Sequence, residues 1–281
     1  MERRTRILCD GLVFPEGPRW HDGQLWFSDM HAYAVMTVDA KGRLRTTIEV
    51  PGQPSGLGWL PDGRLLIVSM TDRRLLRLEG DRLVEVANLW DLATFHCNDM
   101  VVDAQGRAYI GNFGFDLIAQ EAFRAAEIIL VTPDGEARVV ARDMAFPNGT
   151  VITPDGGTLI VGESAGARLT AFDITADGSL TSRRSWAEIA PVVPDGICLD
   201  SEGCVWVASP TTSEVVRVRA GGEIADRIPL DRHAYACMLG GADGRTLFIL
   251  TAETHDPEEA KRRRGGRIEV VDVAAPRAGW P

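Results

Sequence analysis

Four oxygen-bearing side chains stand at corresponding positions of a repeated sequence pattern and could together bind a metal ion. Asn98, Asn148 and Asp195 each lie eight residues before a turn glycine, and Glu16 lies seven residues before one. Two carboxylates with one or two amide oxygens, and no thiol, suit Ca²⁺, Mg²⁺ or Mn²⁺ better than zinc. A bound dication would relieve the repulsion between the carboxylates and could polarise a substrate carbonyl group. The pattern predicts one divalent cation, with Ca²⁺ as first choice and Mg²⁺, Mn²⁺ or Zn²⁺ as alternatives.

Two of these residues belong to dipeptides that are common in turns, namely Asn148-Gly149 and Asp195-Gly196. Each of their repeats, however, has a separate glycine turn further along, at Gly156 and Gly203. We therefore expect Asn148 and Asp195 at the starts of strands, where a side chain can serve a binding site.

Six glycine-centred turns, each followed by an apolar strand, divide the chain into repeats. The turn glycines are 40, 43, 50, 47 and 41 residues apart, at Gly23, Gly63, Gly106, Gly156, Gly203 and Gly244. This spacing is typical of a four-stranded blade. It predicts an all-β fold, a six-bladed β-propeller that forms a single domain over residues 1–281, with a β-sandwich as the alternative. Because the first strand of each blade lines the central channel, the four oxygen-bearing side chains are expected to form a metal site at one mouth of that channel.

Three further segments have a predicted role in the fold. Residues 5–13 precede the first complete repeat and could close the ring by pairing with Ile268–Val271, which removes exposed sheet edges. The stretch from about Asp116 to Glu127 has a helical pattern and is expected to be an insertion over one face. The basic run Lys261–Arg264 is interpreted as a solvated loop.

The composition argues against several classes of protein. The net charge is −10 with only one basic cluster, so neither nucleic acid nor an anionic membrane is an expected partner. Met1–Arg4 leads into a strand-like segment and no apolar stretch approaches the roughly 20 residues that span a bilayer, so we expect no secretory signal. The five cysteines form no Cys-x-x-Cys pair and are interpreted as reduced thiols, which favours a cytoplasmic location. No phosphate-binding glycine loop is found, so nucleotide-binding proteins are not supported.

Four short stretches run in the same order as in a known family of propellers. They are Phe14–Pro18, Cys97–Asp99, Pro147–Gly149 and Pro194–Gly196. Together they resemble the SMP-30/gluconolactonase/luciferin-regenerating enzyme (LRE)-like family of six-bladed propellers, and the resemblance covers nearly the whole chain.

The resemblance implies a function for each of the four polar residues. A divalent metal would be held by Glu16, Asn148 and Asp195 at the channel mouth. A lactone would be hydrolysed there, with Asp195 also serving as the general base for the attacking water. Asn98 would contact the substrate, or the metal, from the third blade.

One position departs from the family pattern. Sugar-lactone members carry an arginine two residues before the third-blade asparagine, whereas this chain has His96. An acidic substrate contact of those members falls near Asp116, and Phe113 and Phe115 add two aromatic rings to the same rim. Without this arginine, whose planar guanidinium can bind sugar hydroxyls, an aldonolactone is a less favoured substrate. A less polar lactone or ester becomes an alternative. His96 could contact the substrate, handle a proton or be structural, whereas the other histidines considered, at positions 21, 31 and 255, are expected to be solvated.

Three functions remain open at this level. The first is a metal-dependent lactonase whose small-molecule partner is a lactone or ester. The second is an arylesterase or a non-hydrolytic enzyme that uses the same pocket, since a fold does not dictate its chemistry. The third is a non-enzymatic calcium-binding propeller. The oligomeric state cannot be predicted from these patterns.

Overall fold

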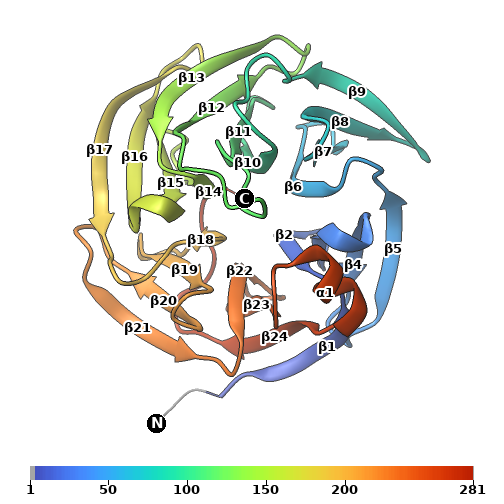
Figure 1. Ribbon diagram of the computed structural model, residues 1–281. Coiled ribbons are helices and arrows are strands. Elements are labelled where there is room, and N and C mark those ends of the chain that lie inside the picture. Colours follow the sequence, from blue (N-terminus) through green and yellow to red (C-terminus); the bar gives the residue numbers. More distant parts are fainter. Residues whose placement is uncertain (1–3, 281) are drawn as a thin grey trace.

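The chain forms a ring of six β-sheets around a central channel, as the computed structural model in Figure 1 shows. The structure describes residues 4–280. The expectation about a secretory signal rests in part on Met1, Glu2 and Arg3, which lie outside this range. Within this range, 24 strands form six antiparallel sheets of four strands each. The predicted all-β, six-bladed propeller is confirmed.

The strands of each blade follow one another outward from the channel (Figure 1). The innermost strands are β2 (Pro15–His21), β6 (Pro54–Trp59), β10 (Cys97–Val102), β14 (Pro147–Ile152), β18 (Ile197–Leu199) and β22 (His233–Gly240). The second strands are β3 (Gln24–Asp29), β7 (Leu65–Ser69), β11 (Ala108–Asn112), β15 (Thr158–Glu163), β19 (Val205–Ser209) and β23 (Thr246–Ala252). The third strands are β4 (Ala34–Val38), β8 (Arg74–Glu79), β12 (Ala126–Val131), β16 (Arg168–Ile174), β20 (Glu214–Val218) and β24 (Gly266–Asp272). The outermost strands are β5 (Leu44–Glu49), β9 (Arg82–Asn88), β13 (Ala137–Met144), β17 (Leu180–Glu188), β21 (Ile224–Pro229) and β1 (Arg6–Leu12).

The ring closes where the amino-terminal strand joins the last blade. Strand β1 pairs with β24 in an antiparallel register that places Arg6 opposite Val270 and Leu12 opposite Gly266. This confirms the closure predicted for residues 5–13. It leaves the sixth sheet with its outermost strand from one end of the chain and its other three strands from the other end.

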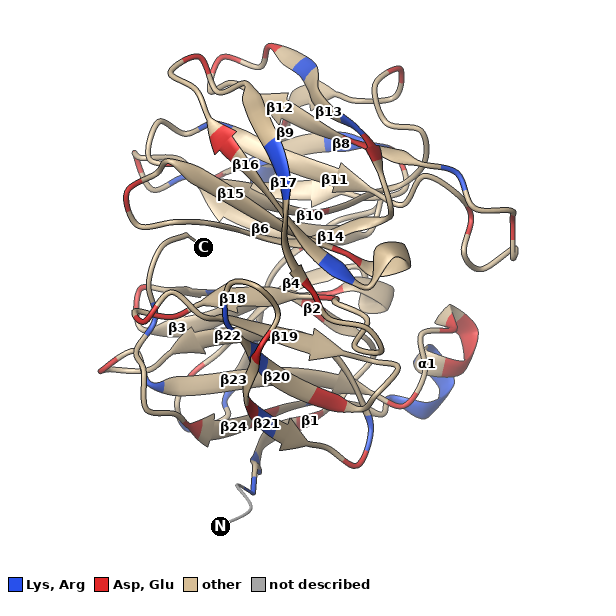
Figure 2. Cartoon of the chain, turned by 90° about the vertical axis from the view of Figure 1, so that its left-hand side faces the viewer, with Lys and Arg blue, Asp and Glu red and all other residues tan. Residues whose placement is uncertain are grey.

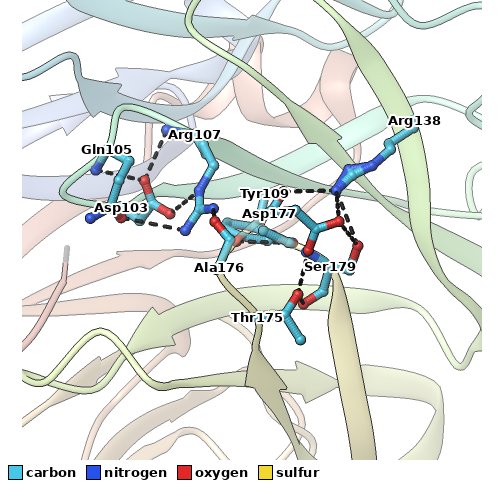
Figure 3. A network of polar contacts seen from close by, with 10 residues as sticks. Asp103, Gln105, Arg107, Tyr109, Arg138, Thr175, Ala176, Asp177 and Ser179 are labelled. Carbon is cyan, nitrogen blue, oxygen red and sulfur yellow. Dashed lines mark hydrogen bonds and ion pairs between the residues drawn. The ribbon is translucent and has the colours of Figure 1, made fainter.

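Polar contacts join neighbouring blades, as Figure 3 shows for the third blade (β10–β13) and the fourth (β14–β17). Arg107 Nη1 donates to the backbone oxygen of Ala176 at 2.8 Å, and the Tyr109 hydroxyl donates to that of Gly178 at 3.1 Å. Asp103 holds the same guanidinium through Nε at 2.6 Å. Because these partners are about 70 residues apart in sequence, the contacts fix one blade against the next.

The helical insertion predicted from Asp116 to Glu127 is wrong. Residues 116–125 form turns and loop, and strand β12 begins at Ala126. Asp116 Oδ1 accepts from Ala119 N at 2.9 Å, and Asp116 N donates to Glu121 Oε2 at 3.1 Å. Such side chain–backbone hydrogen bonds compete with the backbone ladder of a helix and favour turns.

The α-helix of the described chain lies instead at the basic run that was expected to be a loop. Helix α1 (Pro257–Arg263) begins after Asp256, whose Oδ1 accepts from Glu259 N at 2.8 Å, and has proline in its first turn. Lys261, Arg262 and Arg263 occupy its last turn, where cations interact favourably with the helix dipole. Among the described residues, no helix has the length and apolar character needed to cross a bilayer.

The two faces of the ring differ. Helix α1 stands on one face, whereas the carboxyl terminus lies on the opposite face, close to the axis (Figures 1 and 2). There the last residues cross inner strands, because Trp280 exchanges both backbone hydrogen bonds with Ile152 and Ala278 N donates to Leu199 O at 3.0 Å. All five cysteines are free thiols, as predicted.

Candidate functional site

A cavity of about 690 Å³ opens on the face that carries α1, and Pro257 of that helix contributes to its lining. All six predicted site residues line this one cavity, namely Glu16, His96, Asn98, Asp116, Asn148 and Asp195. The sequence register therefore brings together residues that are up to 179 positions apart. Cavities of this size hold small organic molecules.

Glycines next to these residues let the innermost strands approach one another closely. A Cβ atom on Gly149 would lie 2.4 Å from Ile197 N, and one on Gly196 would lie 2.5 Å from the Cβ of Ala236. Gly149 N also donates to Asp195 O at 3.2 Å, which links the fourth and fifth blades. The Asn-Gly and Asp-Gly dipeptides therefore serve close strand packing and not hairpin turns.

Asn148, the second residue of β14, is buried and held by a neighbour that the sequence analysis did not consider. Its Nδ2 donates to Ser164 Oγ at 3.2 Å, and Ser164 Oγ in turn donates to Pro194 O at 2.7 Å. Ser164 belongs to a short 3₁₀ turn, Ser164–Gly166, at the end of β15. This chain of hydrogen bonds fixes the amide plane of Asn148 between two blades.

Asn98 is held from two sides as well. Its Oδ1 accepts from Ser55 Oγ and its Nδ2 donates to Pro147 O, both at 3.4 Å. Asn98 is buried and lies in β10, so it joins the second, third and fourth blades at the cavity floor.

The two carboxyl groups on the cavity floor, those of Glu16 and Asp195, share an unfavourable electrostatic environment. Burial raises the pKa of Glu16 to about 8, although Gly17 N donates to its Oε2 at 3.0 Å. Burial and then the charge of Glu16 raise the pKa of Asp195 well above its usual range, while a hydrogen bond from Asn148 opposes the shift. A bound cation would supply the counter-charge that both carboxylates need.

Nearby cations supply little of that charge, because Arg19 is the smallest of the influences on the pKa of Glu16. Arg19, three residues after Glu16, pairs through Nη2 with Asp99 at 2.7 Å and donates from Nε to Leu57 O at 3.0 Å. In the described part of the chain, neither Lys nor Arg lines the cavity.

The donor set that meets at the floor consists of two carboxylates and two amides, which fits a hard divalent cation. Over residues 4–280, no group of three or more His, Cys, Asp or Glu side chains could hold a metal ion. Any cation here would therefore depend on the amide oxygens of Asn98 or Asn148 in addition to the carboxylates. The metal site at the channel mouth stays a prediction.

His96 and Asp116 lie at the rim of the cavity. The His96 ring stacks on Phe95 with a centroid distance of 4.0 Å, and burial followed by the charge of Arg73 lowers its pKa. Asp116 lines the cavity while its Oδ1 accepts from Ala119 N. Both residues can contact a bound molecule from above the floor.

Tyr235 is a cavity residue that the sequence analysis missed. It lies in β22, next to Ala236, which stands eight residues before the turn glycine Gly244. Burial and the charges of Asp195 and Glu16 raise its pKa, so the phenol stays protonated and can donate a hydrogen bond.

The expectation that His31 is solvated is wrong. It is buried in the cavity wall, where its ring stacks on Phe14 at 4.8 Å. Its Nδ1 accepts from Gln53 Nε2 and its Nε2 donates to His255 O, both at 3.3 Å, which defines a neutral imidazole. His21 is half-buried against a tryptophan instead of solvated, whereas His255 is exposed as predicted.

The buried His31 should make folding stability depend on pH. Burial lowers its pKa to about 4, whereas the unfolded side chain titrates near 6.5. Between these values the unfolded state binds more protons, so stability falls as the pH drops from 6.5 to 4, by about 3 kcal/mol from this group. Urea unfolding across this range should show a steeper loss for the wild type than for His31→Gln. Exposed His255→Gln serves as the control, and parallel wild-type and His31→Gln profiles would contradict the assignment.

Comparisons with known proteins agree with this architecture. The family model described as SMP-30/Gluconolactonase/LRE-like region matches residues 14–253. A 6-deoxy-6-sulfogluconolactonase of Pseudomonas putida is 26% identical over 90% of this chain and 88% of its own length. A pentonolactonase of Haloferax volcanii is 25% identical over 96% of this chain and 94% of its own length. The crystal structure of a calcium-binding protein, regucalcin, from Agrobacterium tumefaciens superposes with a TM-score of 0.80 at 23% identity, covering 99% of this chain and 98% of that one.

Proposed function

The chain belongs to the SMP-30/gluconolactonase/LRE-like family, and from this premise we propose that it hydrolyses a lactone with the help of a divalent cation. The observation that carries the proposal is the convergence of Glu16, Asn98, Asn148 and Asp195 on one cavity. The names of the two lactonase relatives support lactone hydrolysis, and the calcium-binding regucalcin supports Ca²⁺ as the cation.

The proposed ligands are Glu16, Asn148 and Asp195, with Asn98 beside them. When bound, a divalent cation polarises the lactone carbonyl and stabilises the negative charge that develops on its oxygen. The hydrogen bonds from Asn148 through Ser164 to Pro194 favour this assignment because they hold the amide in one orientation before anything binds.

In the proposed reaction Asp195 accepts a proton from the attacking water. The water oxygen forms a bond to the carbonyl carbon, the ring C–O bond breaks, and the released alkoxide oxygen takes up a proton to give the hydroxy acid. Asn98, His96 and Asp116 would contact the substrate, and the protonated Tyr235 is placed to donate a hydrogen bond to it. Burial strengthens the polar contacts that are made on the floor.

Proton release tests the proposal directly, because hydrolysis of a lactone at neutral pH liberates an acid. We expect release with at least one lactone when Ca²⁺ is present and loss of at least about 95% of that rate after chelation. The panel should hold sugar lactones, aryl lactones and aryl esters, with Mg²⁺, Mn²⁺ and Zn²⁺ tried separately. Absence of hydrolysis with every metal would overturn the proposal, and calcium binding without turnover would favour a non-enzymatic calcium-binding propeller.

A further inference from the structure

The cavity has two chemically different parts. Its floor carries the carboxylates and amides described above. Above the floor stand the rings of Phe95, Phe113, Phe115 and Phe146, which we call the aromatic wall. A ligand that fills the whole cavity must therefore present polar atoms at one end and apolar surface at the other.

Phe146 is at the centre of the aromatic wall. Its ring meets those of Phe113 at 5.0 Å and Phe115 at 5.9 Å, in both cases edge to face. Its backbone is left-handed with φ of 60°, a conformation that is unfavourable for a bulky residue. The strand that follows carries Asn148, and the Phe146 carbonyl accepts from Ser164 N at 3.0 Å. The fold thus maintains an unfavourable backbone conformation at Phe146, and this conformation places its aromatic ring against the candidate site.

The rim of the cavity is apolar as well. Leu117 and Ile118 belong to the loop after β11, line the cavity, and are 41% and 53% exposed. Exposed apolar side chains that border a pocket mark a surface that an apolar ligand can cover.

The charged side chains around the cavity further restrict the class of ligand that it can bind. The acidic side chains that line the cavity are Glu16, Asp116 and Asp195, and neither Lys nor Arg of the described chain is among the lining residues. Four histidines also line the cavity, namely His31, His96, His233 and His255, and the two hydrogen bonds of His31 hold it as a neutral imidazole. With the proposed cation on the floor, a sulfonate or carboxylate at the other end of the substrate would meet Asp116 with neither Lys nor Arg to pair with it. Ring hydroxyls at that end would lie against phenyl groups that offer no hydrogen-bond partner.

Building on the proposed lactone hydrolysis, we infer that the substrate is an uncharged lactone with an aryl group, which binds against the aromatic wall while its ester group lies on the floor. Edge-to-face contacts with Phe113, Phe115 and Phe146 would hold the aryl group. This substrate class differs from the sugar lactones named for the two relatives.

Three δ-lactones of matched ring size test the inference. Dihydrocoumarin carries an aryl group, its 6-carboxylate adds one negative charge, and glucono-1,5-lactone carries hydroxyls. Each kcat/KM is divided by the uncatalysed hydrolysis constant, because the phenolic leaving group makes the aryl lactones intrinsically more reactive. We expect dihydrocoumarin to exceed both of the others at least about tenfold.

Substitutions in and beside the aromatic wall give the second arm. Phe146→Ala should lower kcat/KM for dihydrocoumarin about tenfold or more, chiefly through KM, and change that for glucono-1,5-lactone less than about twofold. Phe146→Leu should recover part of the loss. Phe123→Ala is the matched control, because Phe123 is 56% exposed and contacts Phe115 at 5.8 Å without lining the cavity. This substitution should leave kcat/KM unchanged for both lactones.

Failure of the inference can be separated from failure of the proposed hydrolysis. Equal or higher normalised kcat/KM for glucono-1,5-lactone, or an equal loss for both lactones in Phe146→Ala, would overturn the inference alone. If no lactone is hydrolysed, calorimetry with the lactam analogues decides. Binding of 3,4-dihydro-2-quinolinone that is stronger than binding of gluconolactam, and that Phe146→Ala weakens, would support the aryl-binding wall without hydrolysis. No binding of the quinolinone would reject it.

Discussion

Asp195→Asn is expected to reduce lactone hydrolysis at least about a thousandfold while making the metal-free protein more stable. The loss of activity follows from the two roles proposed for this carboxylate, which are to accept the proton of water and to help hold the cation. Asparagine has nearly the same shape but can do neither as well, because its amide is not basic and carries no charge.

The gain in stability has a separate cause. In the metal-free protein Asp195 is buried beside Glu16, and its raised pKa means that folding disfavours the ionised form. At pH 7 the folded state must therefore keep a buried charge or take up a proton, and both cost free energy. Replacement by asparagine removes that cost, on the order of 1–2 kcal/mol, and should raise the melting temperature in chelator by a few degrees.

Asp200→Asn is the matched control for this pair of effects. Asp200 lies five residues further along, is buried, and pairs with Arg217 at 2.7 Å. Its replacement removes the buried one of the two carboxylate partners of the part-buried Arg217, which keeps Glu202 at 2.7 Å, and should destabilise the protein by about 2 kcal/mol, while kcat of the folded enzyme is unchanged. The prediction fails if Asp195→Asn keeps wild-type turnover, or if the two substitutions shift the metal-free melting temperature in the same direction.

Much of the fold could be predicted because each blade of a propeller repeats the same pattern of turns and strands in the sequence. The glycine turns set the length of each blade, and counting back from them located Asn98, Asn148 and Asp195 at one cavity. Asn-Gly and Asp-Gly were ambiguous locally, and only the register distinguished strand packing from turns. Close contact between inner strands, as at Gly149, is the physical reason for that pattern.

Other features depend on contacts that no local pattern contains. His31 is buried because Gln53 and the loop of His255 close around it, and a histidine in a short turn gives no sign of that. Tyr235 lies one residue before the position that the spacing from the turn glycine selects. Whether its ring reaches the carboxylates therefore depends on the exact path of β22. The loop at Asp116 was mistaken for a helix because its side-chain hydrogen bonds to the backbone override the apolar pattern.

Calcium is expected to stabilise the wild-type protein strongly, and Glu16→Gln should remove most of that effect. A ligand that binds only the folded state at a hundred times its dissociation constant stabilises by about 2.7 kcal/mol, which corresponds to a rise of about 5–10 °C in melting temperature. Glutamine cannot supply the charge that a hard cation needs, so the rise should shrink to about 2 °C or less. Calorimetric melting of both proteins in chelator and in excess Ca²⁺ measures the difference.

Glu163→Gln provides the control, because Glu163 is another buried carboxylate but pairs with Arg168 at 2.9 Å and does not line the cavity. The Glu163→Gln protein should melt at a lower temperature than the wild type. Excess Ca²⁺ should raise its melting temperature by as much as it raises that of the wild type. The same logic predicts a reversal for Asp195→Asn, which should be more stable than the wild type in chelator and less stable in Ca²⁺. A purely structural carboxylate would change stability in one direction under both conditions, so absence of the reversal would contradict the assignment of Glu16 and Asp195 to a cation site.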